Sequence, residues 1–233
     1  DTDNTWSMVF DSGNDEYIDL GDNTYLNLGT ENFTISAWVK VGDWTSQNII
    51  SKKQDGDYSW KFCSTGVDKL QFTSEGNNVA GPNLTGVGTL TAHEGSWVQV
   101  TVVSDRDSYT RLFINGVLDK EVTADTSAVD LDNTGDAYIC RLGAVYLDGN
   151  VDEVAIWSDA LDNDAVRAIY NGGDGGVDYL KNQGAYDNYS SLLSGWWRMG
   201  DGDTYPTITD NSTNSNNGTM TNMASDDIVE DTP

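Results

Sequence analysis

The chain has 233 residues, a length that suits one large β-domain or one domain with an appendage. It carries 12 Lys and Arg against 38 Asp and Glu, a net charge of −26. This charge repels nucleic-acid phosphates and anionic lipid headgroups, so we expect neither nucleic acid nor a membrane surface as a partner. No run of 18 apolar residues is present, so membrane insertion is not expected. The chain opens with Asp rather than Met, which suggests a processed chain or a piece of a longer one.

Alternating apolar and polar residues, separated by Gly, Asp and Asn turns, predict a series of strands with the spacing of an all-β sandwich. The clearest strand is 33–40, whose odd-numbered apolar residues share one face. Asn115-Gly116 predicts a type I′ hairpin turn. The predicted strands are 6–10, 16–20, 33–40, 48–52, 58–64, 69–73, 97–104, 111–114, 137–142 and 193–199.

One short helix is predicted near residues 162–171. Asp162 can cap its first turn, and Gly172-Gly173 supplies a left-handed stop. The apolar stripe at helical spacing consists of Ala165, Val166, Ile169 and Tyr170.

The carboxy-terminal segment continues beyond this helix, with the strand at 193–199 and a polar series from Asp210 to Met220. These residues either complete the sandwich from its other end or begin a second repeat that is cut short. A segment of about 40 residues cannot bury a sheet alone. We therefore expect residues 181–233 to supply strands that complete the sandwich formed by residues 1–180.

Five short segments share a distinctive order along residues 6–172, namely Phe10 to Ile18, Phe33 to Val39, Trp97 to Val100, Leu112 to Gly116 and Asp152 to Val154. In this order the chain resembles the LamG-like domains, which belong to the concanavalin A-like jelly rolls. The resemblance implies an all-β, two-sheet antiparallel jelly-roll sandwich with one short helix near residues 162–171. The carboxy-terminal series also resembles the endings of marine phage and marine bacterial surface proteins.

Catalysis is a possibility to weigh, because glucanases that share this fold use two Glu flanking an Asp on one strand. The chain has no Glu-x-Asp-x-Glu motif. Asp152 and Glu153 are adjacent in a predicted strand, so we expect them to point to opposite faces. His93, the only histidine, lies in a Thr/Gly-rich loop with no evident nucleophile. We therefore expect that the chain is not an enzyme.

The resemblance also implies a calcium ion, because LamG-like folds often bind one through an early turn together with the Asp of the closing strand. Hard cations take several oxygen ligands from carboxylates and carbonyls. An inward-facing Asp152 needs such a partner, or else it caps a loop by accepting hydrogen bonds from backbone amides. The positions that match the calcium ligands are Asp11, Gly13, Asn14, Asp15 and Asp152.

Aromatic side chains on the polar faces of predicted strands are candidates for contact with sugar rings. Trp38 and Trp97 each share a face with polar residues, and flat apolar rings suit the C–H faces of pyranoses. The alternative is that they pack beneath loops or the helix. The aromatic residues near the turn at 55–57, which we expect at the rim of a binding site, are Trp44, Tyr58 and Trp60.

Cys63 and Cys140 lie in predicted strands. An oxidising compartment would allow them to pair, and otherwise they are two buried thiols.

Taken together, these patterns favour a non-catalytic LamG-like module for adhesion, located outside the cell or on a virion surface, that binds a glycan and holds structural calcium. The alternative is an architectural protein, such as a capsid decoration or tail component, that contacts neighbouring surface or virion proteins.

Overall fold

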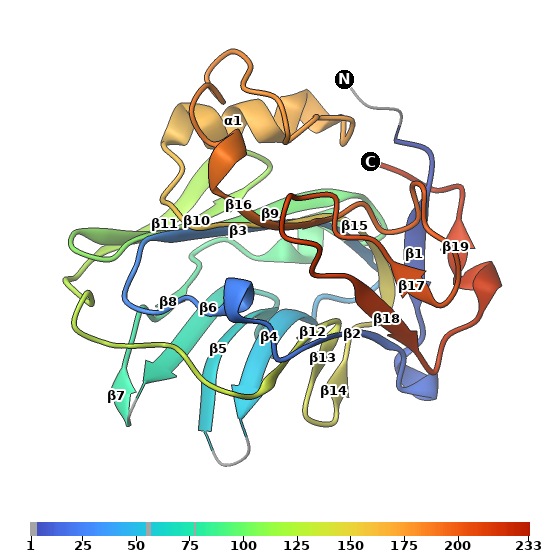
Figure 1. The fold of residues 1–233 in the computed structure, drawn as a ribbon, viewed down its shortest axis with the longest axis horizontal. Helices are drawn as coiled ribbons and strands as arrows, with labels where there is room; N and C mark the ends of the chain where they lie inside the picture. The colour runs from blue at the N-terminus through green and yellow to red at the C-terminus, as the bar shows by residue number, and fades with distance from the viewer. Residues whose placement is uncertain (1–3, 55–56, 77) are drawn as a thin grey trace.

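The computed structural model describes residues 4–54, 57–76 and 78–233, and the side chains of residues 54 and 57–59 are outside this description. Within the described residues, the strands form two large antiparallel sheets and one small two-stranded sheet (Figure 1). The all-β, two-sheet antiparallel sandwich expected from the sequence is therefore confirmed.

Sheet A has the spatial order β11-β10-β9-β3-β15-β1-β19, and β16 pairs with β15 beside this path. Its strands are β1 (Ser7–Phe10), β3 (Phe33–Val41), β9 (Val98–Asp105), β10 (Tyr109–Ile114), β11 (Val117–Thr123), β15 (Gly149–Trp157), β16 (Leu193–Trp197) and β19 (Ile228–Val229).

Sheet B has the order β17-β18-β2-β12-β4-β5-β6-β7, and β8 pairs with β6. Its strands are β2 (Tyr17–Gly21), β4 (Asn48–Gln54), β5 (Asp57–Ser64), β6 (Leu70–Gly76), β7 (Val79–Ala80), β8 (Leu84–Thr85), β12 (Asp136–Ile139), β17 (Thr207–Ile208) and β18 (Gly218–Thr221).

The small hairpin pairs β13 (Arg141–Leu142) with β14 (Val145–Tyr146). The sequence predicts a single strand over 137–142, but Cys140 adopts φ 66° and separates β12 from β13. Ser51 Oγ of β4 donates to the carbonyl oxygen of Arg141 (2.6 Å), which ties the hairpin to sheet B.

Short helical segments complete the described fold. The α-helix is α1 (Asn163–Tyr170), and the 3₁₀ turns are Ser12–Asn14, Thr24–Leu26, Leu90–His93, Asn171–Gly173, Ser190–Leu192 and Ser225–Asp227. Within the described residues, no helix is long and apolar enough to cross a membrane.

The main core lies between the two sheets and follows from strand alternation. Phe33, Ile35, Ala37 and Val39 of β3 all point into it, as the sequence predicts. The other side chains of β3 point to the outer face of sheet A, where Ser36 Oγ lies 2.9 Å from Thr101 Oγ1 of β9. The Asn115-Gly116 turn joins β10 and β11 with φ 50° and 69°, as a type I′ turn requires.

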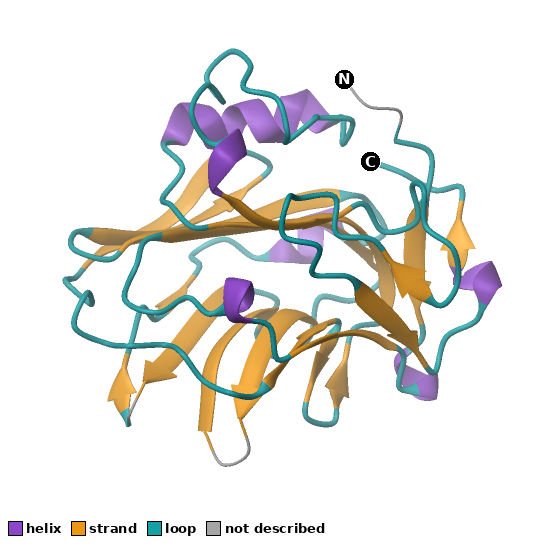
Figure 2. Cartoon of the chain, viewed as in Figure 1, coloured by secondary structure: helices purple, strands orange, loops and turns teal. Residues whose placement is uncertain are grey.

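Helix α1 covers the outer face of sheet A, on the side away from sheet B (Figure 2). Asp162 Oδ1 caps the helix by accepting from the amides of Asp164 (3.0 Å) and Ala165 (2.8 Å), a contact worth about 1 kcal/mol. The first left-handed residue after the helix is Asn171 (φ 50°), one position before the predicted glycines. The buried helix face, Ala165, Val166 and Ile169, forms a second core with Phe113 and Trp157 of sheet A.

Strands from the carboxy-terminal quarter enter both sheets. β16 pairs with β15, β18 pairs with β2, and β19 pairs with β1. In Figure 1, β17, β18 and β19 lie beside β1 at one side of the sandwich. The last strands are therefore hydrogen-bonded to the first strands of the chain.

The two cysteines are buried free thiols. Cys140 belongs to the core between the sheets, whereas Cys63 lies on the outer side of sheet B. Because they are on opposite faces of one sheet, they do not form the disulfide that the sequence left open.

Candidate functional site

The turn between β1 and β2 contains four of the five residues predicted to bind calcium. Asp11 Oδ1 accepts from the Gly13 amide (2.7 Å), and Asp11 Oδ2 accepts from Asn14 Nδ2 (3.0 Å). Asn14 Nδ2 also donates to Glu16 Oε1 (3.3 Å). Asp15 closes the turn in the left-handed conformation, with φ 58°. The carboxylates of Asp11 and Glu16 thus already accept hydrogen bonds from the turn itself.

Asp152, the fifth predicted ligand, lies apart from this turn. Phe10, the residue before the turn, pairs with Gly149, which is three residues, or roughly 10 Å, from Asp152 along β15. Calcium ligands lie only about 2.3–2.6 Å from the ion. Asp152 is therefore separated from the turn along β15, and calcium binding by these five residues together stays a prediction. Among the described residues, no group of three or more His, Cys, Asp or Glu is placed to hold a metal ion.

A β-bulge in β15 places Asp152 and Glu153 on the same face of sheet A. The register with β3 shifts between Asp152 and Ala155, and Glu153 has φ 47°. Val151 and Val154 both point into the core between the sheets, so the two residues between them both point outward. The prediction that Asp152 and Glu153 face opposite sides is therefore wrong, because it assumes regular alternation.

Both carboxylates of this pair are fully buried. Glu153 accepts from Arg198 Nε (3.1 Å) and from the indole N–H of Trp196. Asp152 accepts from Asn4 Nδ2 (3.0 Å) and from the Glu153 amide (2.7 Å). Burial raises the pKa of Glu153 to about 7, and burial together with the charge of Glu153 raises the pKa of Asp152. A substrate in solution cannot reach either group.

Trp44 and Trp60, which the sequence places at an exposed rim, are fully buried in the core between the sheets. Trp60 and Phe62 alternate with outward-facing residues in β5 and so point inward. The prediction of Trp44 and Trp60 as rim residues is wrong. Tyr58 lies in β5, but its side chain is outside the described residues.

Trp38 lies on the outer face of sheet A, but α1 covers it. The side chain is 1% exposed, and its ring stacks on Tyr170 with centroids 5.6 Å apart and 27° between the planes. The alternative that Trp38 packs beneath the helix is therefore confirmed, and this ring is not available to a sugar. Trp97 is half-buried, and its indole N–H donates to Asp231 Oδ1 (3.2 Å).

An exposed aromatic ring is found instead at Tyr25, in the loop between β2 and β3. Asn23 Oδ1 accepts from the Tyr25 amide (3.0 Å) and caps the short turn Thr24–Leu26. Leu26 is buried in the core and anchors this turn, whereas the side chain of Tyr25 is 54% exposed. A ring held in this way offers a flat surface on which a ligand can stack.

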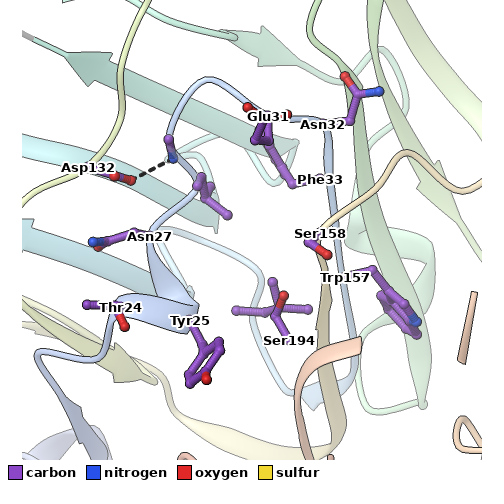
Figure 3. A pocket seen from close by; sticks show the side chains of 13 residues that line it. Thr24, Tyr25, Asn27, Glu31, Asn32, Phe33, Asp132, Trp157, Ser158 and Ser194 are labelled. Atoms are coloured by element: carbon purple, nitrogen blue, oxygen red, sulfur yellow. Dashed lines mark hydrogen bonds between the residues drawn. The ribbon is translucent and has the colours of Figure 1, made fainter. Parts of the chain in front are cut away.

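A cavity of about 210 Å³ lies beside Tyr25, where β3 begins and β15 ends (Figure 3). Phe33 and Ile156 contribute apolar surface to it. Its other side chains are mostly polar and come from loops far apart in the sequence. The polar residues that line it include Asn27, Glu31, Asn32, Asp132, Ser158 and Ser194.

Asp132 and Gly29 fix one wall of this cavity. The Gly29 amide donates to Asp132 Oδ1 (2.8 Å), the dashed line in Figure 3. Gly29 has φ 49°, a conformation that strains residues with a Cβ atom. The buried Arg106 holds the same loop, because its Nη1 donates to the Gly29 carbonyl oxygen (3.1 Å). Burial and the charge of Asp130 raise the pKa of Asp132.

A second hollow of about 330 Å³ continues from the first and shares Tyr25, Asn27, Ser158 and Ser194 with it. The side-chain oxygen of Asn27 is buried and has no hydrogen-bond partner in the protein. We call the two hollows together the Tyr25 groove. The residues that only the second hollow adds are Ser191, Leu192, Leu193, Thr213 and Asn214.

Sequence reasoning missed this groove because its residues share no motif and come from five separate segments. One signal was present, a run of polar and glycine residues from Gly21 to Gly29 that surrounds Tyr25 and reads as a loop. Loops are where binding residues concentrate. The partners from residues 132, 158, 194 and 214 become visible only in three dimensions.

The family model described as the concanavalin A-like lectin/glucanases superfamily matches residues 12–167, about two thirds of the chain. The chain belongs to this superfamily. The LamG-like resemblance is thereby confirmed, since the match is to a laminin G family model. A search of curated protein sequences gives no match to the chain.

Several solved structures share the fold of this chain. A protein from Bacteroides ovatus, named for a proposed role in carbohydrate binding, matches with a TM-score of 0.67 and 19% identity, over 93% of this chain and 58% of its own. The binding domain of Paraclostridial Mosquitocidal Protein 1 matches with a TM-score of 0.54 and 16% identity, over 65% of this chain and 39% of its own. The receptor binding domain of botulinum neurotoxin C/D mosaic serotype matches with a TM-score of 0.50 and 20% identity, over 63% and 37%. At these identities the matches show the shared fold alone.

Proposed function

We propose that this chain is a non-catalytic glycan-binding module and that the Tyr25 groove binds the saccharide. The observation that carries the proposal is the exposed Tyr25 ring beside two hollows with walls rich in hydroxyl, amide and carboxylate groups. Sugars offer apolar C–H faces and many hydroxyl groups, so they need this combination of a flat ring and polar walls. The Bacteroides ovatus protein with the same fold gives further support.

We propose a binding module rather than an enzyme because the paired carboxylates are buried away from any substrate. Asp152 and Glu153 are both buried, and Glu153 is ion-paired with Arg198. Glu31 and Asp132 are the two carboxylates that line the first hollow. Asp132 accepts a hydrogen bond from the Gly29 amide, so this carboxylate holds the wall of the hollow in place.

We further propose that the module serves adhesion outside the cell or on a virion surface. The support is the resemblance of its carboxy-terminal series to marine phage and bacterial surface proteins, and the net charge of −26, which opposes contact with nucleic acid. Calcium binding stays a prediction and is no part of this proposal.

One feature favours the alternative, an architectural module that contacts neighbouring proteins. β11 is the edge strand of sheet A, and Val117, Leu118 and Val122 are exposed on it. Exposed apolar side chains on an edge strand are suited to pairing with another chain.

Binding of neutral and acidic oligosaccharides on a glycan array, followed by calorimetry on each hit, tests the glycan proposal. We expect Tyr25→Ala to weaken binding of a groove ligand about tenfold, or ~1.4 kcal/mol, because the stacking surface is lost. Tyr25→Phe is the matched control and should bind within about twofold of the unmodified chain, since it keeps the ring. A well-folded chain that binds no glycan, and that self-associates instead, would support the architectural alternative.

A further inference from the structure

A third hollow, of about 400 Å³, lies on the outer face of sheet B beside the β13–β14 hairpin. It shares no residue with the Tyr25 groove. In Figure 1, α1 lies over the outer face of sheet A, and the small hairpin lies on the outer side of sheet B near β4 and β12. We call the hollow the Asn48 pocket. The residues that line it include Asn48, Lys61, Cys63, Gln71, Leu142 and Val145.

Asn48 lies at the floor of this pocket. Its residue is 2% exposed, and neither the oxygen nor the nitrogen of its side-chain amide has a hydrogen-bond partner in the protein. The shift in register between Asn48 and Ile50 lets Ile49 and Ile50 both enter the core, while Asn48 faces the pocket. A buried amide without partners costs about 1–3 kcal/mol, so a polar ligand that supplies partners recovers this free energy.

The walls of the pocket combine apolar and polar groups. Leu142 and Val145 of the hairpin form an apolar side, and Val145 is 46% exposed at the rim. Gln71 lies opposite, with its Nε2 donating to Thr85 Oγ1 (2.8 Å), which holds the amide in place. An apolar wall facing fixed amides suits the C–H face and the hydroxyl groups of a sugar ring.

The pocket differs from the Tyr25 groove in charge. No Asp or Glu is among its described lining residues, although the chain contains 38 of them, whereas Glu31 and Asp132 line the groove. Burial raises the pKa of Cys63 to about 11, so this thiol adds no negative charge at neutral pH. Lys61 is the cationic residue among the described lining residues. An anion that the rest of this acidic surface repels is therefore accommodated here.

A second cationic residue, Arg141, lies at the start of the β13–β14 hairpin. Arg141 precedes Leu142, and its guanidinium lies over the rings of Tyr17 (4.4 Å) and Tyr138 (4.6 Å). None of the described carboxylates lies within ion-pair distance of it. Arg141 is not among the lining residues, so Lys61 is the cation that a ligand inside the pocket meets.

We propose that the Asn48 pocket is a second saccharide site and that it takes a sugar carrying a carboxylate, a uronic acid residue of an acidic polysaccharide. The uronate ring packs on Leu142 and Val145, its hydroxyl groups meet the amides of Asn48 and Gln71, and its carboxylate faces Lys61. This site goes beyond the proposed function, because it is separate from the Tyr25 groove and selects for charge.

Calorimetric titration with trisaccharides of galacturonate, glucuronate and mannuronate, each beside its methyl ester, tests the site on the full chain. We expect at least one uronate to bind about tenfold more tightly than its neutral ester, and the preference to shrink as salt is raised. Lys61→Gln should reduce the preference for the acid and leave binding of the ester unchanged.

Asn48→Ala should weaken uronate binding about tenfold, while Tyr25→Ala leaves it unchanged. Because Asn48 is buried and its variant can lose stability, Val145→Asp gives a second test at an exposed position, where the new carboxylate should abolish uronate binding without loss of the fold. The inference is overturned if no uronate binds, if the esters bind equally well, or if Val145→Asp binds as the unmodified chain does. Loss of neutral-glycan binding on Tyr25→Ala with uronate binding intact would separate the two sites.

Discussion

At the scale of single residues, Glu153 shows how one backbone angle changes the chemistry of a strand. With φ 47° it forms a bulge, so that its carboxylate and that of Asp152 share a buried site with Arg198 and Trp196. Two adjacent acids in one apolar environment cannot both ionise without a large cost. Burial therefore raises the pKa of Glu153 to about 7, and Arg198 offsets only part of this effect.

Because the Glu153 carboxyl is buried, we expect the free energy of unfolding to fall as the pH rises. Glu153 binds a proton more tightly in the folded chain than in the unfolded chain, where its pKa is near 4.5. Its stabilisation is fully present below about pH 4.5 and is lost as the pH rises through about 7, at up to ~1.4 kcal/mol per pKa unit. Urea denaturation at pH 5, 6, 7 and 8 measures this, and Glu153→Gln should flatten the dependence. An equal slope in Glu153→Gln and the unmodified chain would contradict the prediction.

At the scale of elements, α1 packs on the outer face of sheet A, and its last residue Tyr170 stacks on Trp38. The ring is 1% exposed against Tyr170, and the helix contributes Ala165, Val166 and Ile169 to the same side of the sheet. Outward-facing aromatic residues on sheet A therefore hold the helix rather than a ligand.

Trp38→Ala should destabilise the fold by about 3–5 kcal/mol, because a large buried ring is lost and the cavity closes only in part. Trp97→Ala, which removes a half-buried ring with one hydrogen bond to Asp231, is the comparison and should cost only about 1 kcal/mol. Guanidinium denaturation followed by tryptophan fluorescence measures both. An equal loss in the free energy of unfolding for the two variants would mean that Trp38 does not stabilise the packing of α1.

At the scale of the whole molecule, the two ends of the chain are joined through the sheets. Trp197, Met199, Ile208, Met220 and Met223 of the last fifty residues belong to the core between the sheets. β16, β18 and β19 meanwhile cover the edges of β15, β2 and β1. A sandwich without these strands would expose both its core and its strand edges.

The chain 1–180 should therefore fail to unfold cooperatively, because removing 181–233 uncovers the core on one side. Differential scanning calorimetry and near-ultraviolet circular dichroism measure this. Adding residues 181–233 as a separate peptide should restore a cooperative transition if the defect is the missing strands. Cooperative unfolding of 1–180 alone would instead place a domain boundary near residue 180.

The sequence by itself determined the fold class, the residues of β3 that share the core face, the hairpin at Asn115-Gly116 and the helix capped by Asp162. These features depend on local periodicity and turn chemistry, which neighbouring residues carry. Tertiary structure alone decided that Trp44 and Trp60 are core residues, that the bulge puts Asp152 and Glu153 together, and that Asp152 lies apart from Asp11. It also decided which side chains meet in the Tyr25 groove and the Asn48 pocket. The physical reason is that a binding surface is assembled from loops and strands far apart in the sequence, and one inserted bulge or left-handed residue redirects every side chain around it.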